Sequence, residues 1–342
     1  MRIDSTPPCD WDAGLPSPAL SRAFAAASVH LGYTSLFVTG AARDCRALVL
    51  VRRVPVPLLS AWTAHAHVYT SATAPLFLGR LLERLGALGI SHVRIGDGLW
   101  GSEHPLAVPW PHARPELRHV LVHPPAPTAA EAVAAMDREA RARIRKTERL
   151  GVVVDEVRTE ADLAAYCALA EETSARMRSR HVAAVYPAAF LRAIFTEMVP
   201  TRQAVFLLAR WHGRALAGAF YFVSPTRLGQ CHGVSTRDRA LTCAEGPSAV
   251  AWHALHLARS HGLEFDLGVT TPTTDASHPH FSVFRFKRAF GGTLRERHGA
   301  EVILSPAKHR FQHVMLRPLW ARLHPVYLRM FGDCRRKRRV GA

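Results

Sequence analysis

The chain has 342 residues, of which 48% are hydrophobic and 21% charged, as is typical of a folded globular protein rather than a disordered one. This length suits two ordinary domains or one large domain. No apolar run approaches the roughly 18 residues of a membrane span, and the acidic, proline-containing start does not resemble a signal peptide. These features predict a cytoplasmic protein with no integral membrane association.

The charge is strongly positive, because 44 Lys and Arg residues stand against 27 Asp and Glu, a net charge of +17. Such an excess favours polyanionic partners: nucleic acid, nucleotide-linked substrates or an anionic membrane surface. The cations are mostly arginine and alanine is abundant, a bias that a GC-rich coding background also produces. The charge alone therefore leaves the partner open.

The cysteines and histidines form no recognisable metal-binding pattern. The six cysteines are scattered without a CxxC pair, and the twenty histidines make no HExxH motif and no Cys/His finger. We therefore expect no metal site.

Residues 1–128 alternate predicted strands and helices. Apolar and β-branched runs bounded by glycine and charge predict strands at 34–40, 46–54 and 91–98. Leucines spaced three and four residues apart predict an amphipathic helix over 74–89. The proline-rich stretch 102–128 is typical of a connector, with room for one more strand around "RHVLVH".

The next part of the chain opens with a basic helix, predicted over 128–151. Thr128 and Glu131 form a capping box at its start, and Gly151 ends it. The later elements are expected in this order: a strand at 152–157, a helix at 159–177, a hairpin at 204–223 turning at His212-Gly213, a strand at 227–235, a helix at 246–262, a strand at 263–268, a short helix at 284–290 and a strand or hairpin at 293–305.

Residues 306–342 are amphipathic, interrupted by Pro318 and Pro325, and end in a basic tail at 333–342. Basic tails are usually solvated. Contact with an anionic partner is the alternative.

Four segments in this order resemble the FemAB-like branch of the GNAT acyltransferase superfamily: "RIRKTERLGVVVDEV", "ARWHGRALAGAFYFV", "ARSHGLEFDLG" and "FRFKRAFGG". The resemblance covers residues 129–304. It implies an α/β (α+β) fold of two GNAT-like modules side by side, with mixed, mostly antiparallel sheets flanked by helices. Residues 1–128 would be a divergent first module, to which the helices of 306–342 could belong, and residues 129–305 the FemAB-like module.

The resemblance implies an acyltransferase, with two kinds of donor among family members. Some members take an amino acid from aminoacyl-tRNA and add it to peptidoglycan precursors or to amine intermediates of peptide-like natural products. Others are presumed to use acyl-CoA. The CoA-type Q/R-x-x-G-x-G/A loop is absent, since the matching stretch "TRDRALTCAEGPSA" has glycine only at Gly246. The helical arm of some peptidoglycan members is also missing.

We therefore expect aminoacyl-tRNA as co-substrate, no further cofactor, and a small-molecule or muropeptide-like amine as acceptor. An acyl-CoA-dependent N-acyltransferase is the alternative with the same fold. A non-catalytic nucleic-acid-binding module is the alternative from another class.

Lys287 is the first catalytic candidate, because the resemblance makes it the lysine of the family's F-K-x-x-F-G motif. Held among phenylalanines, its ammonium would stabilise developing negative charge; the alternative is a lysine whose stem lies on the rings while its head reaches solvent. Asp266 is the second, at the C-terminal end of a strand, where it would orient a substrate amine or cap the next loop. Gly268 would allow close backbone approach. A splayed strand edge, either "GAFYFV" or "QCHGVS", would supply N–H groups to the oxyanion.

Arginines and one lysine supply the expected substrate contacts. The helix cations would contact tRNA phosphates, with a solvated helix face as the alternative: Arg143, Arg145, Lys146 and Arg149. A second group would bind the acceptor, with favourable placement at a helix C-terminus as the alternative: Arg176, Arg178 and Arg180. Arg285 and Tyr221 complete the substrate-binding candidates, and packing is the alternative for Tyr221.

Overall fold

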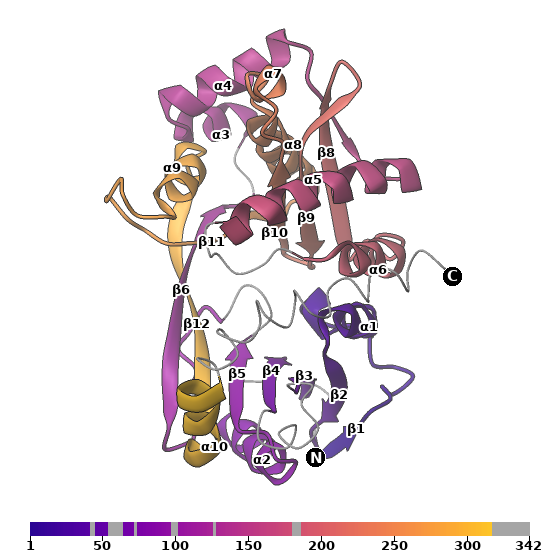
Figure 1. The fold of residues 1–342 in the computed structure, drawn as a ribbon, viewed down its shortest axis with the longest axis vertical. Coiled ribbons are helices and arrows are strands. Elements are labelled where there is room, and N and C mark those ends of the chain that lie inside the picture. The colour runs from indigo at the N-terminus through magenta and orange to yellow at the C-terminus, as the bar shows by residue number, and fades with distance from the viewer. Residues whose placement is uncertain are drawn as a thin grey trace.

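The computed structural model describes residues 1–41, 45–53, 64–71, 74–96, 102–125, 128–179 and 186–316. Their strands form one continuous twelve-stranded sheet, in the order β1-β2-β3-β4-β5-β12-β6-β11-β10-β9-β8-β7 (Figure 1). The strands are β1 (Arg2–Asp4), β2 (Thr34–Thr39), β3 (Arg46–Arg52), β4 (His65–Thr70), β5 (His92–Gly96), β6 (Ala113–His123), β7 (Val153–Glu156), β8 (Ala204–Trp211), β9 (Arg214–Val223), β10 (Arg227–Ser235), β11 (Glu264–Thr270) and β12 (Thr293–Ile303).

Helices cover both ends of this sheet (Figure 1). They are α1 (Arg22–Ser28), α2 (Pro75–Ala87), α3 (Ala129–Ala135), α4 (Arg138–Arg149), α5 (Glu160–Ser179), α6 (Ala188–Met198), α7 (Arg239–Thr242), α8 (Gly246–Ser260), α9 (Phe281–Ala289) and α10 (Pro306–Arg310). Two strand pairs are parallel, β4 with β5 and β10 with β11, and a helix connects each pair, α2 in the first case and α8 in the second. This repeated β-α-β unit confirms the expected class: two side-by-side modules with a mixed, mostly antiparallel sheet.

Strands β6 and β12 join the two halves of the sheet. They pair with each other along ten residue positions, and β12 also pairs with β5 while β6 also pairs with β11. Figure 1 shows both strands running along one side of the molecule from the lower half to the upper half. The sequence-based division after residue 128 remains a prediction, and it would place these two partner strands in different modules.

An aromatic cluster fixes the junction between the halves. Phe24 of α1 packs edge-to-face on Phe222 of β9 and on Phe190 of α6, with ring centroids 5.6 and 6.4 Å apart. All three rings are buried. Each such ring contributes about 1.5–3 kcal/mol through removal from water, so the junction is a packed core.

The expected basic helix over 128–151 is wrong in one respect, because it is broken into α3 and α4. The capping box of Thr128 and Glu131 opens α3 as predicted. Met136 is then extended and buried, and the Asp137 side chain accepts a hydrogen bond of 2.7 Å from the Ala140 N–H. Asp137 is therefore the N-cap of a new helix, α4. An N-cap residue has a non-helical backbone, so one continuous helix cannot pass through this position.

The remaining sequence-predicted elements of residues 129–305 are confirmed. The hairpin of β8 and β9 turns at His212 and Gly213, whose φ angles of 50° and 73° suit the tight turns that join antiparallel strands. Thr159 directly precedes helix α5, and its hydroxyl accepts a hydrogen bond from the Asp162 N–H at 3.1 Å.

The described start of the C-terminal segment packs on the first half of the sheet. Gln312 donates a hydrogen bond of 3.0 Å to the Ser91 hydroxyl, and the His309 ring lies 5.3 Å from that of His92. Residues 317–342, which include the basic tail 333–342, lie outside the described part of the chain.

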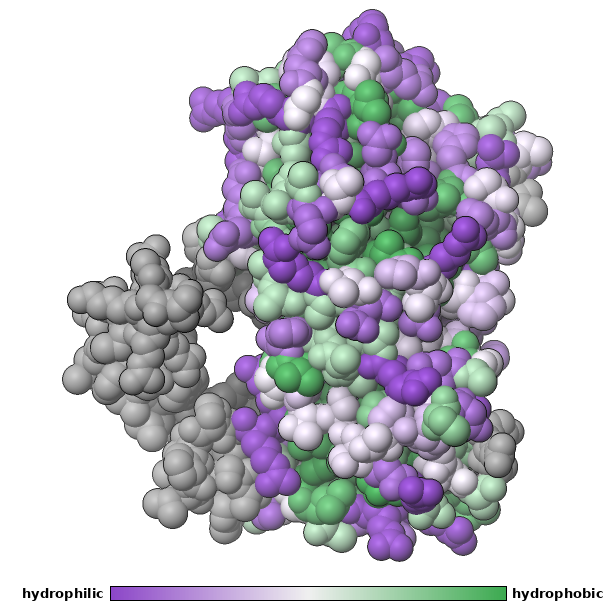
Figure 2. All heavy atoms as spheres, turned by 90° about the vertical axis from the view of Figure 1, so that its right-hand side faces the viewer, coloured by the Kyte–Doolittle hydropathy of each residue, from purple (hydrophilic) through white to green (hydrophobic). Residues whose placement is uncertain are grey.

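Among the described helices, none has both the length and the apolar character that crossing a membrane requires. On the face in Figure 2, hydrophobic side chains form several separate patches among hydrophilic ones.

Gly218 provides a test of how closely helix α5 lies on the sheet. A Cβ at this position of β9 would lie 2.8 Å from both the Leu207 carbonyl oxygen and the Tyr166 ring. We expect Gly218→Ala to lower the free energy of unfolding by about 1–3 kcal/mol, because the buried ring must shift. Gly86→Ala, at an exposed helix position with no atom near the new Cβ, should instead raise it by up to about 1 kcal/mol. The free energies of unfolding of the wild type, Gly218→Ala and Gly86→Ala are compared by urea denaturation. Equal stability of Gly218→Ala and wild type would contradict the expectation.

Candidate functional site

Strands β10 and β11 run together and then separate. Their parallel pairing covers only Arg227, Leu228 and Gly229 on β10, the last of them opposite Asp266. Beyond that point β10 continues to Ser235 without β11 as a partner, and both strands have irregular register there. Alternate backbone groups of the β10 stretch therefore face a gap between the strands.

The open edge belongs to one of the two stretches expected from sequence. Residues 230–235, "QCHGVS", pair with β9 on one side and have no β11 partner on the other. The "GAFYFV" alternative is wrong, because this part of β9 is paired with β8 on one side and β10 on the other.

Lys287 projects from α9 onto the end of β11. Its ammonium donates hydrogen bonds to the carbonyl oxygens of Gly268 and Val269, at 3.1 and 2.8 Å. Burial lowers the pKa of Lys287 to about 8, with the Asp266 carboxylate opposing the shift. Phe284 and Phe290 are buried and anchor the helix in the core. The ammonium thus faces the place where β10 and β11 separate, and the described residues accept hydrogen bonds from two of its three N–H groups.

Asp266 is fully buried at the same place. One carboxylate oxygen accepts a 2.7 Å hydrogen bond from the Gly268 N–H, and the other, Oδ2, has no hydrogen-bond partner. Burial raises the pKa of Asp266, while the Gly268 N–H and the charges of Arg227, Arg297 and Lys287 act in the opposite direction.

Gly268 shapes the backbone of this site. Its φ is +78°, and a Cβ would lie 2.6 Å from the Gln230 carbonyl oxygen and 3.6 Å from the Lys287 nitrogen. Only glycine fits both the left-handed conformation and the close approach of the two strands.

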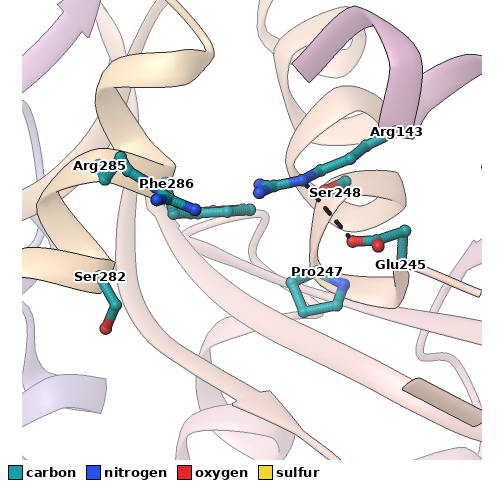
Figure 3. Close-up of a pocket in the computed structure, with 7 residues that line it drawn as sticks. All are labelled: Arg143, Glu245, Pro247, Ser248, Ser282, Arg285 and Phe286. Atoms are coloured by element: carbon teal, nitrogen blue, oxygen red, sulfur yellow. Dashed lines mark ion pairs between the residues drawn. The ribbon is translucent and has the colours of Figure 1, made fainter. Parts of the chain in front are cut away.

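A pocket of about 270 Å³ lies on the other side of α9, between α4 and the start of α8. Its lining residues are Arg143, Glu245, Pro247, Ser248, Ser282, Arg285 and Phe286. Figure 3 shows the Phe286 ring and the Arg143 side chain reaching toward each other, with Pro247 at the start of α8. Glu139 forms ion pairs with both pocket arginines, and the Arg143 Nε lies 3.9 Å from the Glu245 carboxylate.

The first turn of α8 offers little to a bound anion. Glu245 precedes it in a left-handed conformation, and Pro247 has no N–H. The N–H groups of Ser248 and Ala249 both donate to the Glu245 carbonyl oxygen, at 2.9 and 3.2 Å. Among the described residues only the N–H of buried Gly246 is left in this turn, so side chains would have to supply most of the contacts to a phosphate.

The other sequence-predicted site residues lie in different parts of the fold. Arg176 lies at the far end of the open edge, where it donates to the Ser235 carbonyl oxygen at 3.3 Å. Tyr221 is 1% exposed and packs near Phe265, which matches the packing alternative. The Arg178 side chain and Arg180 lie outside the described residues.

The α4 cations divide into two groups. Arg143 lines the pocket, and Lys146 is half-buried. Arg145 and Arg149 are exposed.

Sequence analysis missed two residues of the pocket lining, Glu245 and Ser248. Their only signal in the sequence was the Glu-Gly-Pro-Ser start of a helix. Across the described chain, no His, Cys, Asp and Glu side chains are grouped as a metal ion would need.

Residues 134–288 match the family model of the acetyltransferase (GNAT) domain. FemX, at 13% identity, has the same fold with a TM-score of 0.66, covering 92% of this chain and 100% of its own. L-PGS from Bacillus licheniformis is 11% identical with a TM-score of 0.51, covering 90% and 98%.

A third similar structure is the C-terminal domain of a putative lysylphosphatidylglycerol synthetase from Agrobacterium fabrum, 12% identical with a TM-score of 0.50, covering 82% and 87%. No curated protein matches the chain in sequence. Since FemX is a FemAB-family protein, the sequence resemblance to this branch is confirmed at the level of the fold.

The protonation of Lys287 can be measured directly. The chain has four lysines, Lys146, Lys287, Lys308 and Lys337, so selective ¹³C labelling gives a simple NMR spectrum. We expect the Cε signal that disappears in Lys287→Arg to titrate with a pKa of about 8, because burial disfavours the ammonium. Free lysine, whose side chain has a pKa of about 10.4, is titrated under the same conditions as the reference. A Lys287 titration coinciding with that of free lysine would contradict the shielding inferred from the structure.

Proposed function

We propose that the protein is an aminoacyltransferase, which moves an amino acid from aminoacyl-tRNA to an amine of a small specialised-metabolite intermediate or a cell-wall precursor in the cytoplasm. The observation that carries this proposal is the gap between β10 and β11, with Lys287 and Asp266 at its edge. The FemX-like fold supports it, as does the name of the synthetase-domain relative, which indicates a lysyl group joined to phosphatidylglycerol.

In this reaction the acceptor nitrogen attacks the ester carbonyl of the aminoacyl-tRNA. The C–N bond forms, the ester C–O bond breaks, and the nitrogen's proton leaves with the terminal ribose oxygen of the tRNA. N–H groups of residues 230–235 and the remaining N–H of Lys287 stabilise the tetrahedral oxyanion. Asp266 is buried and acts indirectly: its carboxylate accepts the Gly268 N–H and so holds the turn whose carbonyl oxygens position Lys287.

The choice of tRNA over CoA rests on the start of α8. CoA-dependent members of the superfamily bind the pyrophosphate on backbone N–H groups of this turn. Here Pro247 has none, the N–H groups of Ser248 and Ala249 are used within the helix, and only that of Gly246 is left among the described residues. The match to the acetyltransferase (GNAT) family model favours the rival, an acyl-CoA-dependent N-acyltransferase, so the donor needs its own test.

Lys287→Ala tests the reaction centre. We expect kcat to fall about 100- to 1,000-fold, the usual cost of losing one oxyanion donor, while the circular dichroism spectrum stays unchanged. Arg288→Ala is the matched control, since Arg288 is the exposed cation next to Lys287 on the same helix. Near-normal turnover by Lys287→Ala would remove the lysine from the mechanism.

Ribonuclease treatment tests the donor. A pool of radiolabelled aminoacyl-tRNAs is incubated with the protein and cell extract, and label that leaves the tRNA for an amide product is counted. We expect this transfer to stop when the tRNA is digested beforehand. Product formed after digestion, on addition of acyl-CoA, would support the CoA alternative, and no product with either donor would support a non-catalytic binding module.

A further inference from the structure

A group of ion pairs lies beside Asp266, on the face of the sheet away from α8. Glu264 and Asp266 alternate along β11 with Phe265 and Leu267, which pack into the core on the α8 side. Because neighbouring side chains of a strand point to opposite faces, the two acids point to the other face. These charges are therefore separate from the pocket at the start of α8.

Two glutamates link three arginines in this group, which we call the charge network. Glu264 accepts hydrogen bonds from Arg227 of β10 at 3.3 Å and from Arg295 of β12 at 2.7 Å. Glu103 accepts hydrogen bonds from Arg227 at 3.2 Å and from Arg297 of β12 at 2.8 Å. The charge network thus ties three strands together, and it has one positive charge more than its two carboxylates balance.

Arg297 is the most deeply buried member of the charge network. Its side chain is 1% exposed, and its Nε and Nη2 atoms have no hydrogen-bond partner among the described residues. A guanidinium does not lose its proton in a protein, so the charge of a buried arginine needs a negative charge nearby. Asp266 supplies this charge, since it is fully buried, has one unpartnered carboxylate oxygen, and is acted on by the charges of Arg227 and Arg297.

We propose that Arg297 is a positioning residue of the candidate site, which together with Arg227 keeps Asp266 ionised. Ionised Asp266 accepts the Gly268 N–H and holds the turn whose carbonyl oxygens accept hydrogen bonds from the Lys287 ammonium. Arg297 therefore acts on the lysine through Asp266 and this turn. The inference concerns the site of the proposed function, and it rests on that function only for its effect on turnover.

Opposing effects set the protonation of Asp266. Burial raises its pKa, whereas the backbone N–H of the turn and the charges of Arg227, Arg297 and Lys287 lower it. The other titratable neighbour is Cys231 of β10, and burial raises the pKa of this thiol well above its ordinary range, so it stays uncharged. Loss of the Arg297 charge therefore favours the neutral carboxyl group. A neutral carboxyl group in turn no longer raises the pKa of Lys287.

Carboxyl ¹³C NMR of aspartate-labelled protein tests the inference without any substrate. The Asp266 signal is the one that disappears in Asp266→Asn. We expect Arg297→Gln to raise the pKa of Asp266, because a cation that favours the carboxylate is lost, and Arg297→Lys to keep it near the wild-type value. Glu103→Gln should lower the pKa of Asp266, because the Glu103 carboxylate then no longer offsets the charges of Arg227 and Arg297.

The direction of the shift in Arg297→Gln distinguishes an electrostatic role from a structural one. If Arg297 only held the strands together, its loss would admit water and move the pKa of Asp266 down toward the ordinary value of about 3.9. A lower or unchanged pKa in Arg297→Gln, or an equal rise in Arg297→Lys, would overturn the inference. Should Arg297→Gln not fold, Arg227→Gln makes the same test, and a lower or unchanged pKa of Asp266 there would overturn it equally.

The Lys287 signal gives a second readout. Asp266→Asn should lower the pKa of Lys287 below about 8, because the charge that raises it is gone, and an unchanged value would break the link between the two residues. Arg118→Gln is the matched control. Arg118 lies opposite Arg297 on β6 but pairs with Glu116, outside the charge network, so its loss should change neither pKa.

Turnover separates this inference from the proposed function. In the proposed reaction, Arg297→Gln should move the acid limb of the kcat profile to higher pH, because Asp266 must be ionised and its pKa is raised, while KM stays unchanged. An acid limb at the wild-type pH would remove Arg297 from the mechanism. Absence of transfer from any donor would instead refute the proposed function, and the two NMR titrations would still decide the role of the charge network.

Discussion

The separation of two strands after Gly229 and Asp266 is the constraint on which the site depends. If β10 and β11 stayed paired to their ends, their backbone groups would be used by the sheet, and no gap would exist. Gly268 makes the departure possible, because its positive φ and missing side chain let β11 turn away close to the Gln230 carbonyl oxygen. The carbonyl oxygens of Gly268 and Val269 then lie at the edge of the gap. The Lys287 ammonium hydrogen-bonds to both of them.

Lys287 therefore stabilises the separated strands, and its burial there also changes its own protonation. Holding an ammonium against two carbonyls stabilises the open arrangement, but burial disfavours its charge and lowers its pKa to about 8. Asp266 is displaced in the opposite direction, since burial raises the pKa of its carboxyl group. Both shifts mean that the charged pair costs free energy in the folded state, and each charge partly offsets the cost of the other. An unpartnered oxygen on Asp266 adds to that cost. Sites that tolerate such costs are commonly those where chemistry needs them.

Sequence reasoning succeeded where the signal is local. The hairpin at His212-Gly213 and the capping box at Thr128 depend on neighbours a few residues away, so their residues specify them directly. It failed at Met136, because whether Asp137 continues a helix or starts one depends on whether Met136 is buried by the rest of the fold. The pairing of β12 with both β5 and β6 was equally hidden, since a strand's partners are a tertiary property.

In the candidate site, too, residues within sequence motifs could be predicted and residues brought together by long-range packing could not. The F-K-x-x-F-G motif and the D-x-G strand end pointed to Lys287, Asp266 and Gly268, and the fold brings these three together. The pocket at α8 was less visible, because it depends on the left-handed conformation of Glu245 and on three helices meeting. Residues such as Ser248 carry no sequence signal beyond helix-start composition. Long-range packing, and not residue chemistry, decides which of them face a ligand.

The arrangement of helices gives the gap two separate approaches. Alternate side chains of β9 pack into different cores, with Phe220 and Phe222 on the side of α5 and α6, and Tyr221 on the side of α8 and α9. The pocket belongs to the α8 side, whereas Arg176 of α5 reaches the open edge of β10 from the other side. In the proposed reaction, one substrate would approach the gap from the α8 face and the other from the α5 face. The two substrates of that proposal would meet only where the strands separate, and enclosure of an activated ester at this place would limit its loss to water.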